Sequence, residues 1–587
     1  MLRSTICCIK STSGLSPSTE PLRPAAQQNQ SPISAQPILP EEPINSVLSA
    51  AKTAFPDHLP DIIASATMSS QKSEADLKNA KGEKKSMTGL PKEPWQEDQL
   101  YTIVIFGASG DLAKKKIYPT LWALYRDELL PKNTWIIGYA RSKLSVEDLQ
   151  KSFEGNCKLQ SGDKQKFGEF MKSNLYIAGS YDQPDDYRKL HKTLEEKETQ
   201  FKQGNRAFYL SLPPFVFDTA TTHIRHDCWG TRGWNRVVLE KPFGRDLESS
   251  RKLADHLKKL YREEEIYRID HYLGKELVQN LITLRFANRI FSPAWNNQNI
   301  AHVQISFKEP IGTQGRGGYF DEYGIIRDII QNHLMQVFCL AAMEKPVSLN
   351  AEDIRDEKVR VLRRIQPVKL EDAVLGQYVA DPEGKGEAKT GYLDDETVPK
   401  GSVTPTYAAV LLKIDNERWE GVPFVLRAGK ALNERKAEVR VQFKNPDGDI
   451  FEDGEVKRDE LVMRIQPNEA IYLKMMTKTP NSNFGIEETE LDLTYSKRYE
   501  GLVLAEAYQL LFIEILRGRQ MHFVRNDELE ETWRIFTPLL HQIEREKIKP
   551  TEYKFGSRGP PEADKLAAKN NYVYSGTYVW PGDSPKK

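Results

Sequence analysis

A glycine-containing run behind an apolar segment most strongly constrains how this chain folds. Tyr101–Phe106 reads YTIVIF, and the next eight residues are Gly107, Ala108, Ser109, Gly110, Asp111, Leu112, Ala113 and Lys114. The order strand, glycine turn and helix suits a dinucleotide phosphate, because glycine permits a tight turn and the helix N-terminus attracts an anion. We therefore predict that these eight residues form the phosphate site of a dinucleotide-binding domain.

The residue after the next apolar run indicates which dinucleotide is bound. Thr134–Ala140 is followed by Arg141, where an acidic residue would otherwise hold a ribose 2′-hydroxyl. A guanidinium can pair with a 2′-phosphate through two parallel hydrogen bonds. The sequence therefore favours NADP over NAD, although a solvated surface role for Arg141 stays open on sequence alone.

Composition narrows the possible partners. Lysine plus arginine and aspartate plus glutamate both number 83, so no overall charge favours nucleic acid or an anionic membrane. The five cysteines show neither a Cys-x-x-Cys motif nor zinc-ligand spacing, so we predict no metal site and a reducing compartment. No apolar run reaches the roughly 20 residues of a membrane helix, so we expect a soluble protein.

The chain divides into three parts. Residues 1–98 are rich in Ser, Pro, Ala and Gln and then in Lys and Glu, which predicts a disordered extension. Residues 99–269 alternate strand-like and helical patterns, which predicts a doubly wound, Rossmann-type α/β domain. Residues 270–587 predict a larger α+β domain with a mostly antiparallel sheet. Charges alternate along its strands, so we expect one face to meet solvent or another subunit.

Three polar segments could carry chemistry: Glu240–Gly244, Arg268–Lys275 and Asp328–His333. Each alone is weak evidence, because most lysines and histidines are solvated or structural. Hydride loss from a hydroxylated carbon requires a base near neutral pKa, and His333 is the candidate. On periodicity alone, His333 is better explained as a structural histidine of an amphipathic helix.

These three segments resemble the glucose-6-phosphate dehydrogenase family, as do the glycine turn, Phe320–Gly324 and Arg427–Leu432. The resemblance extends from about Tyr101 to Trp580. The resemblance implies oxidation of glucose 6-phosphate at C1 to the phosphogluconolactone with hydride transfer to NADP, the entry step of the pentose phosphate pathway. It also implies a cytoplasmic homodimer or homotetramer, although the N-terminal extension leaves organelle targeting open.

The resemblance assigns roles to individual residues. His333 is expected to be the base, Asp328 the carboxylate that orients it, and Lys241 the group between nicotinamide and sugar, preceding a cis proline. The residues expected to bind substrate are Lys241, His271, Tyr272, Lys275, Glu309, Asp328, Lys430, Arg435 and Gln466. Those expected to bind a second, structural NADP are Arg427, Lys436, Arg440, Arg464, Tyr472, Lys474, Asp492, Arg558, Tyr574 and Trp580.

One position departs from the family, because Phe217 replaces the tyrosine usual near the nicotinamide. A hydrogen bond from that hydroxyl is therefore absent, and we expect at most a slight loss of binding. Two other functions remain open: a broader hexose-6-phosphate dehydrogenase, disfavoured by the lack of a signal peptide and a lactonase domain, and a silent NADP-binding scaffold. A relative that oxidises free glucose is a further possibility.

Overall fold

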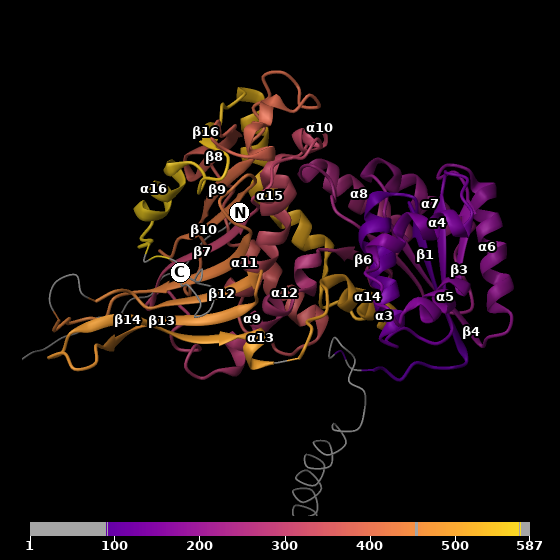
Figure 1. Ribbon diagram of the computed structural model, residues 1–587, viewed down its shortest axis with the longest axis horizontal. Coiled ribbons are helices and arrows are strands. Elements are labelled where there is room, and N and C mark those ends of the chain that lie inside the picture. Colours follow the sequence, from indigo (N-terminus) through magenta and orange to yellow (C-terminus); the bar gives the residue numbers. More distant parts are fainter. Residues whose placement is uncertain (1–89, 91, 452–455, 500, 575, 577–587) are drawn as a thin grey trace, which may run out of the picture. The chain divides into compact units, whose positions relative to one another are not determined.

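In the part of the chain that the structure describes, seven strands form the first sheet, which lies at the right of Figure 1. Their order is β15-β6-β5-β4-β1-β2-β3, and β1 to β6 are parallel whereas β15 is antiparallel. The strands are β1 (Gln99–Phe106), β2 (Thr134–Ala140), β3 (Asn174–Ala178), β4 (Gln203–Leu210), β5 (Asn235–Leu239), β6 (Ile266–Ile269) and β15 (Phe523–Val524). The order 3-2-1-4-5-6 is that of Rossmann-type sheets, whose ligands bind where the winding reverses, here between β1 and β4.

Apolar side chains cover both faces of this sheet. Along β1, Ile103 and Ile105 join one core cluster while Val104 and Phe106 join another, because successive residues of a strand point to opposite faces. The helices of this half are α3 (Tyr118–Arg126), α4 (Val146–Phe153), α5 (Lys164–Lys172), α6 (Pro184–Glu198), α7 (Phe217–Asp227) and α8 (Leu247–Leu260). The expected doubly wound domain is confirmed.

Among the described residues, nine strands form the second sheet, in the order β14-β13-β12-β11-β7-β10-β9-β8-β16. The pairs β7–β10 and β8–β16 are parallel, and the remaining pairs are antiparallel. The strands are β7 (Ile300–Lys308), β8 (Ala373–Val379), β9 (Tyr407–Leu412), β10 (Phe424–Gly429), β11 (Lys436–Phe443), β12 (Glu460–Gln466), β13 (Ala470–Lys478), β14 (Ile486–Thr494) and β16 (Thr551–Lys554). The predicted mostly antiparallel sheet is therefore confirmed.

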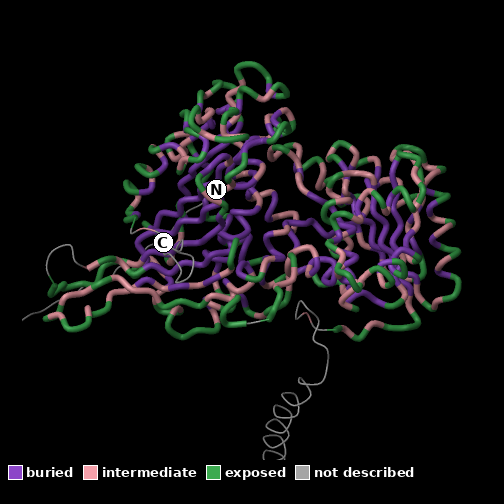
Figure 2. The backbone as a smooth tube through the Cα atoms, in the orientation of Figure 1, coloured by how far each residue is buried: buried purple, intermediate pink, exposed green. Residues whose placement is uncertain are grey.

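Helices of the second half connect the two sheets through one continuous apolar core, and Figure 2 shows the buried backbone running through the strands of both. A π-helical segment, Ile326–Leu334, leads into α11 and carries Asp328 and His333. The helices are α9 (Glu276–Ala287), α10 (Gly317–Asp321), α11 (Met335–Ala342), α12 (Ala351–Leu362), α13 (Tyr495–Arg498), α14 (Ala507–Arg517), α15 (Asn526–Glu546) and α16 (Pro561–Lys569).

The computed structural model describes residues 90, 92–451, 456–499, 501–574 and 576, which lie within one compact unit, Lys85–Lys587. Most of the expected disordered extension falls outside these residues. For residues 92–98 the expectation is wrong: the Trp95 ring meets Tyr101 edge-on, and its Nε1 donates to Leu129 O at 3.0 Å. The half-buried Trp95 ring, together with the Lys132–Glu97 ion pair at 2.9 Å, holds this polar stretch against the sheet.

Candidate active site

The glycine turn follows β1 as predicted. Gly107 has φ +80°, and a Cβ there would lie 2.1 Å from Ser211 O, so only glycine fits. Gly110 N donates to Gly107 O at 2.9 Å and closes the turn before the helix that continues into α3. Within the turn and the following helix, Gly107, Ala108 and Ala113 are buried, Ser109, Gly110, Leu112 and Lys114 are half-buried, and Asp111 is exposed. The backbone geometry fits a pyrophosphate.

Arg141 lies at the same edge of the sheet as the glycine turn. Its neighbour Ser142 has its Oγ 3.4 Å from Ser109 Oγ, so the end of β2 meets the turn after β1. The Arg141 side chain is exposed, with its guanidinium 5.6 Å from the centre of the Tyr181 ring. An exposed guanidinium above an aromatic ring is suited to an adenosine phosphate.

His333 is paired with Asp270, a residue that the sequence reasoning did not single out. His333 Nδ1 lies 2.6 Å from Asp270 Oδ1, and the two side chains are 2% and 3% exposed. Burial raises the pKa of Asp270, but His333 more than offsets it and holds this pKa at about 2. An ionised carboxylate at Nδ1 fixes the ring tautomer and leaves Nε2 as the nitrogen able to accept a proton.

The expectation that Asp328 orients His333 is wrong. Asp328 instead accepts from Lys241 Nζ, through its carbonyl oxygen at 2.5 Å and its Oδ1 at 3.0 Å. Burial raises the pKa of Asp328, whereas Lys241 and Lys430 lower it, with a net value of about 2. Because its carboxylate faces these two ammonium groups, Asp328 is not the hydrogen-bond partner of the imidazole.

One cavity of about 300 Å³ is lined by Lys241, Asp328, Glu309 and Lys430. Lys430 Nζ lies 2.7 Å from Glu309 Oε2 and 4.0 Å from Asp328 Oδ2. The charges thus alternate around the cavity, which presents both donors and acceptors to a polyhydroxylated ligand. The Lys241–Pro242 bond is cis, as the resemblance implied.

A second group of predicted substrate residues surrounds His333. The His271 ring meets the His333 ring edge-on at 4.5 Å, and the Tyr272 ring stacks on it at 4.7 Å. Lys275 Nζ donates to Gln466 Oε1 at 2.7 Å. Burial lowers the pKa of Lys275, and the nearby exposed Arg435 contributes to the lowering. These residues form a basic, partly desolvated patch suited to a phosphate.

The predicted nucleotide residues of the second sheet share one face of it. The structure places Arg427, Lys436, Arg440, Arg464, Tyr472 and Lys474 on β10 to β13, Asp492 on β14, and Arg558 and Tyr574 near the C-terminus, while Trp580 lies outside the described residues.

The part of the expectation that places this charged face in solvent is wrong for Arg427, Arg440 and Lys474, which are buried within the part of the chain that the structure describes. Arg440 is 3% exposed and pairs with Glu438 at 2.8 Å and Glu460 at 2.6 Å. The segment that contains α16 covers the face, since Asp564 lies 2.9 Å from Arg427 and Val573 O accepts from Gln442. Neighbouring carboxylates, and the backbone of the segment that covers the face, compensate the free-energy cost of burying these cations.

Phe217 is fully buried in the apolar core at the start of α7.

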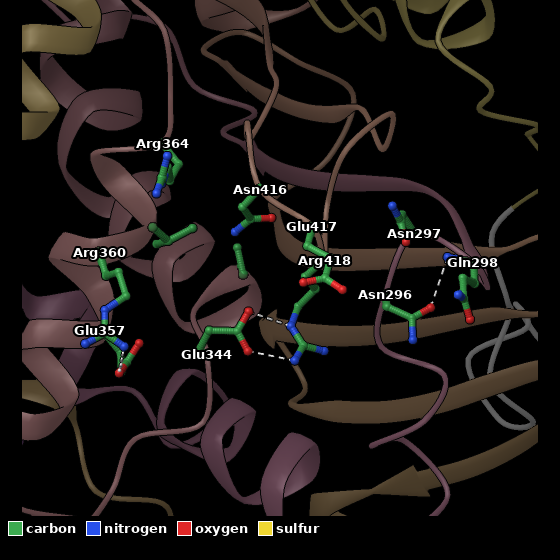
Figure 3. A pocket seen from close by; sticks show the side chains of 12 residues that line it. Asn296, Asn297, Gln298, Glu344, Glu357, Arg360, Arg364, Asn416, Glu417 and Arg418 are labelled. Carbon is green, nitrogen blue, oxygen red and sulfur yellow. Dashed lines mark hydrogen bonds and ion pairs between the residues drawn. The ribbon is translucent and has the colours of Figure 1, made fainter. Parts of the chain in front are cut away.

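A larger polar cavity of about 550 Å³ lies elsewhere, between α12, the residues after α11 and the β9–β10 connection (Figure 3). Its walls carry the Glu344–Arg418 pair and the Glu357–Arg360 pair, and it includes none of the predicted site residues.

Among the described residues, no helix has the length and apolar character needed to cross a membrane.

Asp270 could have been found from the sequence. It directly follows the short strand β6 and precedes His271, so it lies at the carboxyl edge where ligands of an open α/β sheet bind. In the sequence, Asp328 is the more obvious partner of His333, because it is much closer to His333 along the chain than Asp270 is.

Two family models match the chain. A family model described as "Glucose-6-phosphate dehydrogenase, NAD binding domain" matches residues 104–280, and one described as "Glucose-6-phosphate dehydrogenase, C-terminal domain" matches residues 282–575. Glucose-6-phosphate 1-dehydrogenase of Ceratitis capitata is 59% identical, with 82% of this chain and 91% of that protein covered. Glucose-6-phosphate 1-dehydrogenase 2 of Mus musculus is 56% identical, with 83% and 96% covered.

Among solved structures, a glucose-6-phosphate dehydrogenase in complex with its substrate glucose-6-phosphate is similar, with a TM-score of 0.78 and 47% identity. That match covers 82% of this chain and all of the other. A glucose-6-phosphate 1-dehydrogenase from Mycobacterium avium gives a TM-score of 0.70 at 31% identity, with the same coverage.

Proposed function

Because the chain belongs to the glucose-6-phosphate dehydrogenase family, we propose that it oxidises D-glucose 6-phosphate at C1 to 6-phospho-D-glucono-1,5-lactone, with the hydride passing to NADP. This reaction opens the pentose phosphate pathway. The observation that carries the proposal is the buried His333–Asp270 pair, at 2.6 Å, beside a basic patch and a cavity lined by alternating charges.

The base in this reaction is His333. Its Nδ1 donates to Asp270, so its Nε2 is the atom that accepts the proton of the C1 hydroxyl while the C1–H bond breaks. Burial lowers the pKa of His333, which keeps the imidazole neutral and ready to accept at physiological pH. Asp270 stays ionised and stabilises the imidazolium as it forms.

NADP, when bound at the glycine turn, supplies the hydride acceptor. The protein's contribution is placement: Gly107 permits close approach of the backbone, and Arg141 is positioned for a 2′-phosphate. Lys241 holds its ammonium group on Asp328 at the wall of the substrate cavity. This arrangement supports NADP rather than NAD as the preferred cofactor.

The sugar phosphate binds across the two halves of the molecule. His271, Tyr272 and Lys275 follow β6, whereas Gln466 and Arg435 come from the second sheet and its connections. A ligand with nearly two negative charges is stabilised by several cations in a partly desolvated patch. Glu309 and Asp328 are acceptors for sugar hydroxyls at the other side of the cavity.

We also propose a second, structural NADP on the charged face of the second sheet. Support comes from Arg427 and Arg558, which share one carboxylate, Asp564, at 2.9 and 3.8 Å. The Arg558 guanidinium lies 4.4 Å from the centre of the Tyr574 ring. Aromatic rings beside phosphate-directed arginines suit an adenine nucleotide, which would replace Asp564 as their anion.

A homodimer or homotetramer in the cytoplasm completes the proposal. Support for self-association comes from β14, an edge strand of nine residues on which Leu491 and Leu493 remain exposed. Support for a reducing compartment comes from Cys157, Cys228 and Cys339, which are buried free thiols. Light scattering tests the assembly, since a mass of 67.2 kDa for the particle would contradict it.

The assay of NADPH formation tests the function. Wild-type protein should reduce NADP with glucose 6-phosphate far faster than with glucose, and His333→Asn should lower kcat by about 10³-fold or more while glucose 6-phosphate still binds. Preference for glucose would contradict the proposed substrate. Unchanged turnover in His333→Asn would contradict the proposed base.

A further inference from the structure

A buried carboxylate with no role in the proton transfer lies directly behind the site. Glu240 follows β5 and is 7% exposed, and its Oε1 accepts from Tyr209 OH at 2.5 Å and from Tyr508 OH at 3.1 Å. Burying a carboxylate costs free energy unless its oxygens accept hydrogen bonds, and here two phenol hydroxyls donate to one oxygen. Burial raises the pKa of Glu240 above its usual value, and the two phenols and nearby Lys241 only partly offset the rise.

Tyr508 connects Glu240 to the substrate residues. Tyr508 lies on α14, and its ring is parallel to that of His271, with 9° between the planes and 5.9 Å between the centres. His271 in turn meets His333 edge-on at 4.5 Å. A chain of contacts therefore runs from Glu240 through Tyr508 to His271, from three elements that are distant in sequence.

We propose that Glu240 is a positioning residue, which acts through Tyr508 to fix the His271 ring at the phosphate end of the substrate. The inference rests on the proposed function and extends it, since Glu240 itself lies outside the cavity wall. His333 has its own anchor in Asp270, so loss of Glu240 disturbs phosphate binding more than proton transfer.

The hydrogen-bond geometry favours a carboxylate over an amide at position 240. Tyr209 and Tyr508 both donate to the same oxygen, and an ionised carboxylate accepts two such bonds more strongly than an amide. With the Tyr508 hydroxyl fixed at one end, the ring cannot rotate away from His271. Without that anchor, the ring keeps its stacking partner but loses its fixed orientation.

The test is a steady-state comparison of Glu240→Gln and Tyr508→Phe with the wild type. Both variants should raise KM for glucose 6-phosphate about tenfold, with kcat lowered less than threefold and KM for NADP unchanged. Inorganic phosphate should inhibit the wild type competitively, and its inhibition constant should rise in parallel in both variants. A purely structural role would not shift phosphate binding selectively.

The matched control is Tyr392→Phe, which removes another tyrosine-to-carboxylate bond, from Tyr392 OH to Asp321 at 2.7 Å, away from His271. Its KM values should equal those of the wild type. Unchanged KM for glucose 6-phosphate in Tyr508→Phe would overturn the inference, as would an equal rise in the KM for NADP. If Glu240→Gln does not fold, Tyr508→Phe still decides the question, because it deletes a single oxygen.

The wild-type assay separates this inference from the proposed function. No turnover of glucose 6-phosphate by the wild type would contradict the function itself. Normal wild-type turnover combined with unchanged phosphate inhibition in both variants would contradict only the role of Glu240.

Discussion

At the residue scale, Asp270 and Asp328 are two carboxylates of similar acidity with different tasks. Each has a pKa of about 2, yet Asp270 faces an imidazole whereas Asp328 faces two ammonium groups. A carboxylate on the imidazole stabilises charge that develops during the reaction, whereas one held between lysines shapes the ground-state cavity.

Asp270→Asn should therefore lower kcat by about 10²- to 10⁴-fold while glucose 6-phosphate binding changes little. The Asp270 charge raises the pKa of His333, so its removal lowers that pKa further. Because the base must be neutral, the acidic limb of the kcat/KM profile should move to lower pH. The profile is measured from pH 4 to 8.

Asp328→Asn is the matched control, and it should act mainly on KM for glucose 6-phosphate. A large kcat loss in Asp328→Asn with near-normal kcat in Asp270→Asn would restore the pairing that the sequence suggested.

At the element scale, the carboxyl ends of neighbouring parallel strands assemble the cofactor site. The glycine turn follows β1 and Arg141 follows β2, and their neighbours Ser109 and Ser142 lie 3.4 Å apart. Arg141 is exposed and lies over Tyr181, so it contributes little to the core. Its substitution should affect the ligand rather than the fold.

Arg141→Ala should lower kcat/KM for NADP about 10- to 100-fold, the value of a lost charge-assisted pair of hydrogen bonds, and leave kcat/KM for NAD within about twofold. Rates with both coenzymes at fixed glucose 6-phosphate give the ratio. Equal losses with NADP and NAD would show that Arg141 is structural.

The elements that the sequence revealed are those whose signal is local. Strands such as Thr134–Ala140 are largely apolar runs, and in the structure that strand has the bounds predicted from the sequence. The partner of His333 was missed because Asp270 is brought to it by tertiary folding, while Asp328 is near in sequence. The charged face of β11 resembled a solvent face because α16, which helps to cover it, lies more than a hundred residues further along the chain.

At the scale of the whole molecule, the pH dependence of stability includes contributions from buried groups whose pKa differs between the folded and unfolded states. His302 is fully buried on β7, with Nδ1 2.7 Å from Asn570 O, and burial lowers its pKa to about 4. The unfolded chain therefore binds a proton below pH 6.5 that the folded chain does not. The resulting stability is present above pH 6.5 and is lost as the pH falls towards 4, by about 3 kcal/mol.

His302→Gln removes this titration, so its thermal midpoint should fall less than that of the wild type between pH 7 and pH 4.5. Differential scanning calorimetry at several pH values measures the difference. His226→Gln, which replaces an exposed histidine on α7, is the control and should follow the wild type. Parallel curves for His302→Gln and the wild type would contradict the assignment.

The edge strand β15 has a consequence for synthesis. Phe523 pairs with Ile269 and Val524 with Arg268, so the border of the first sheet is closed by residues translated some 250 positions later. While the ribosome is still making the intervening chain, β6 exposes an unpaired backbone edge that other nascent strands could join. A nascent polypeptide stalled before Phe523 should therefore recruit chaperones that the completed molecule no longer needs.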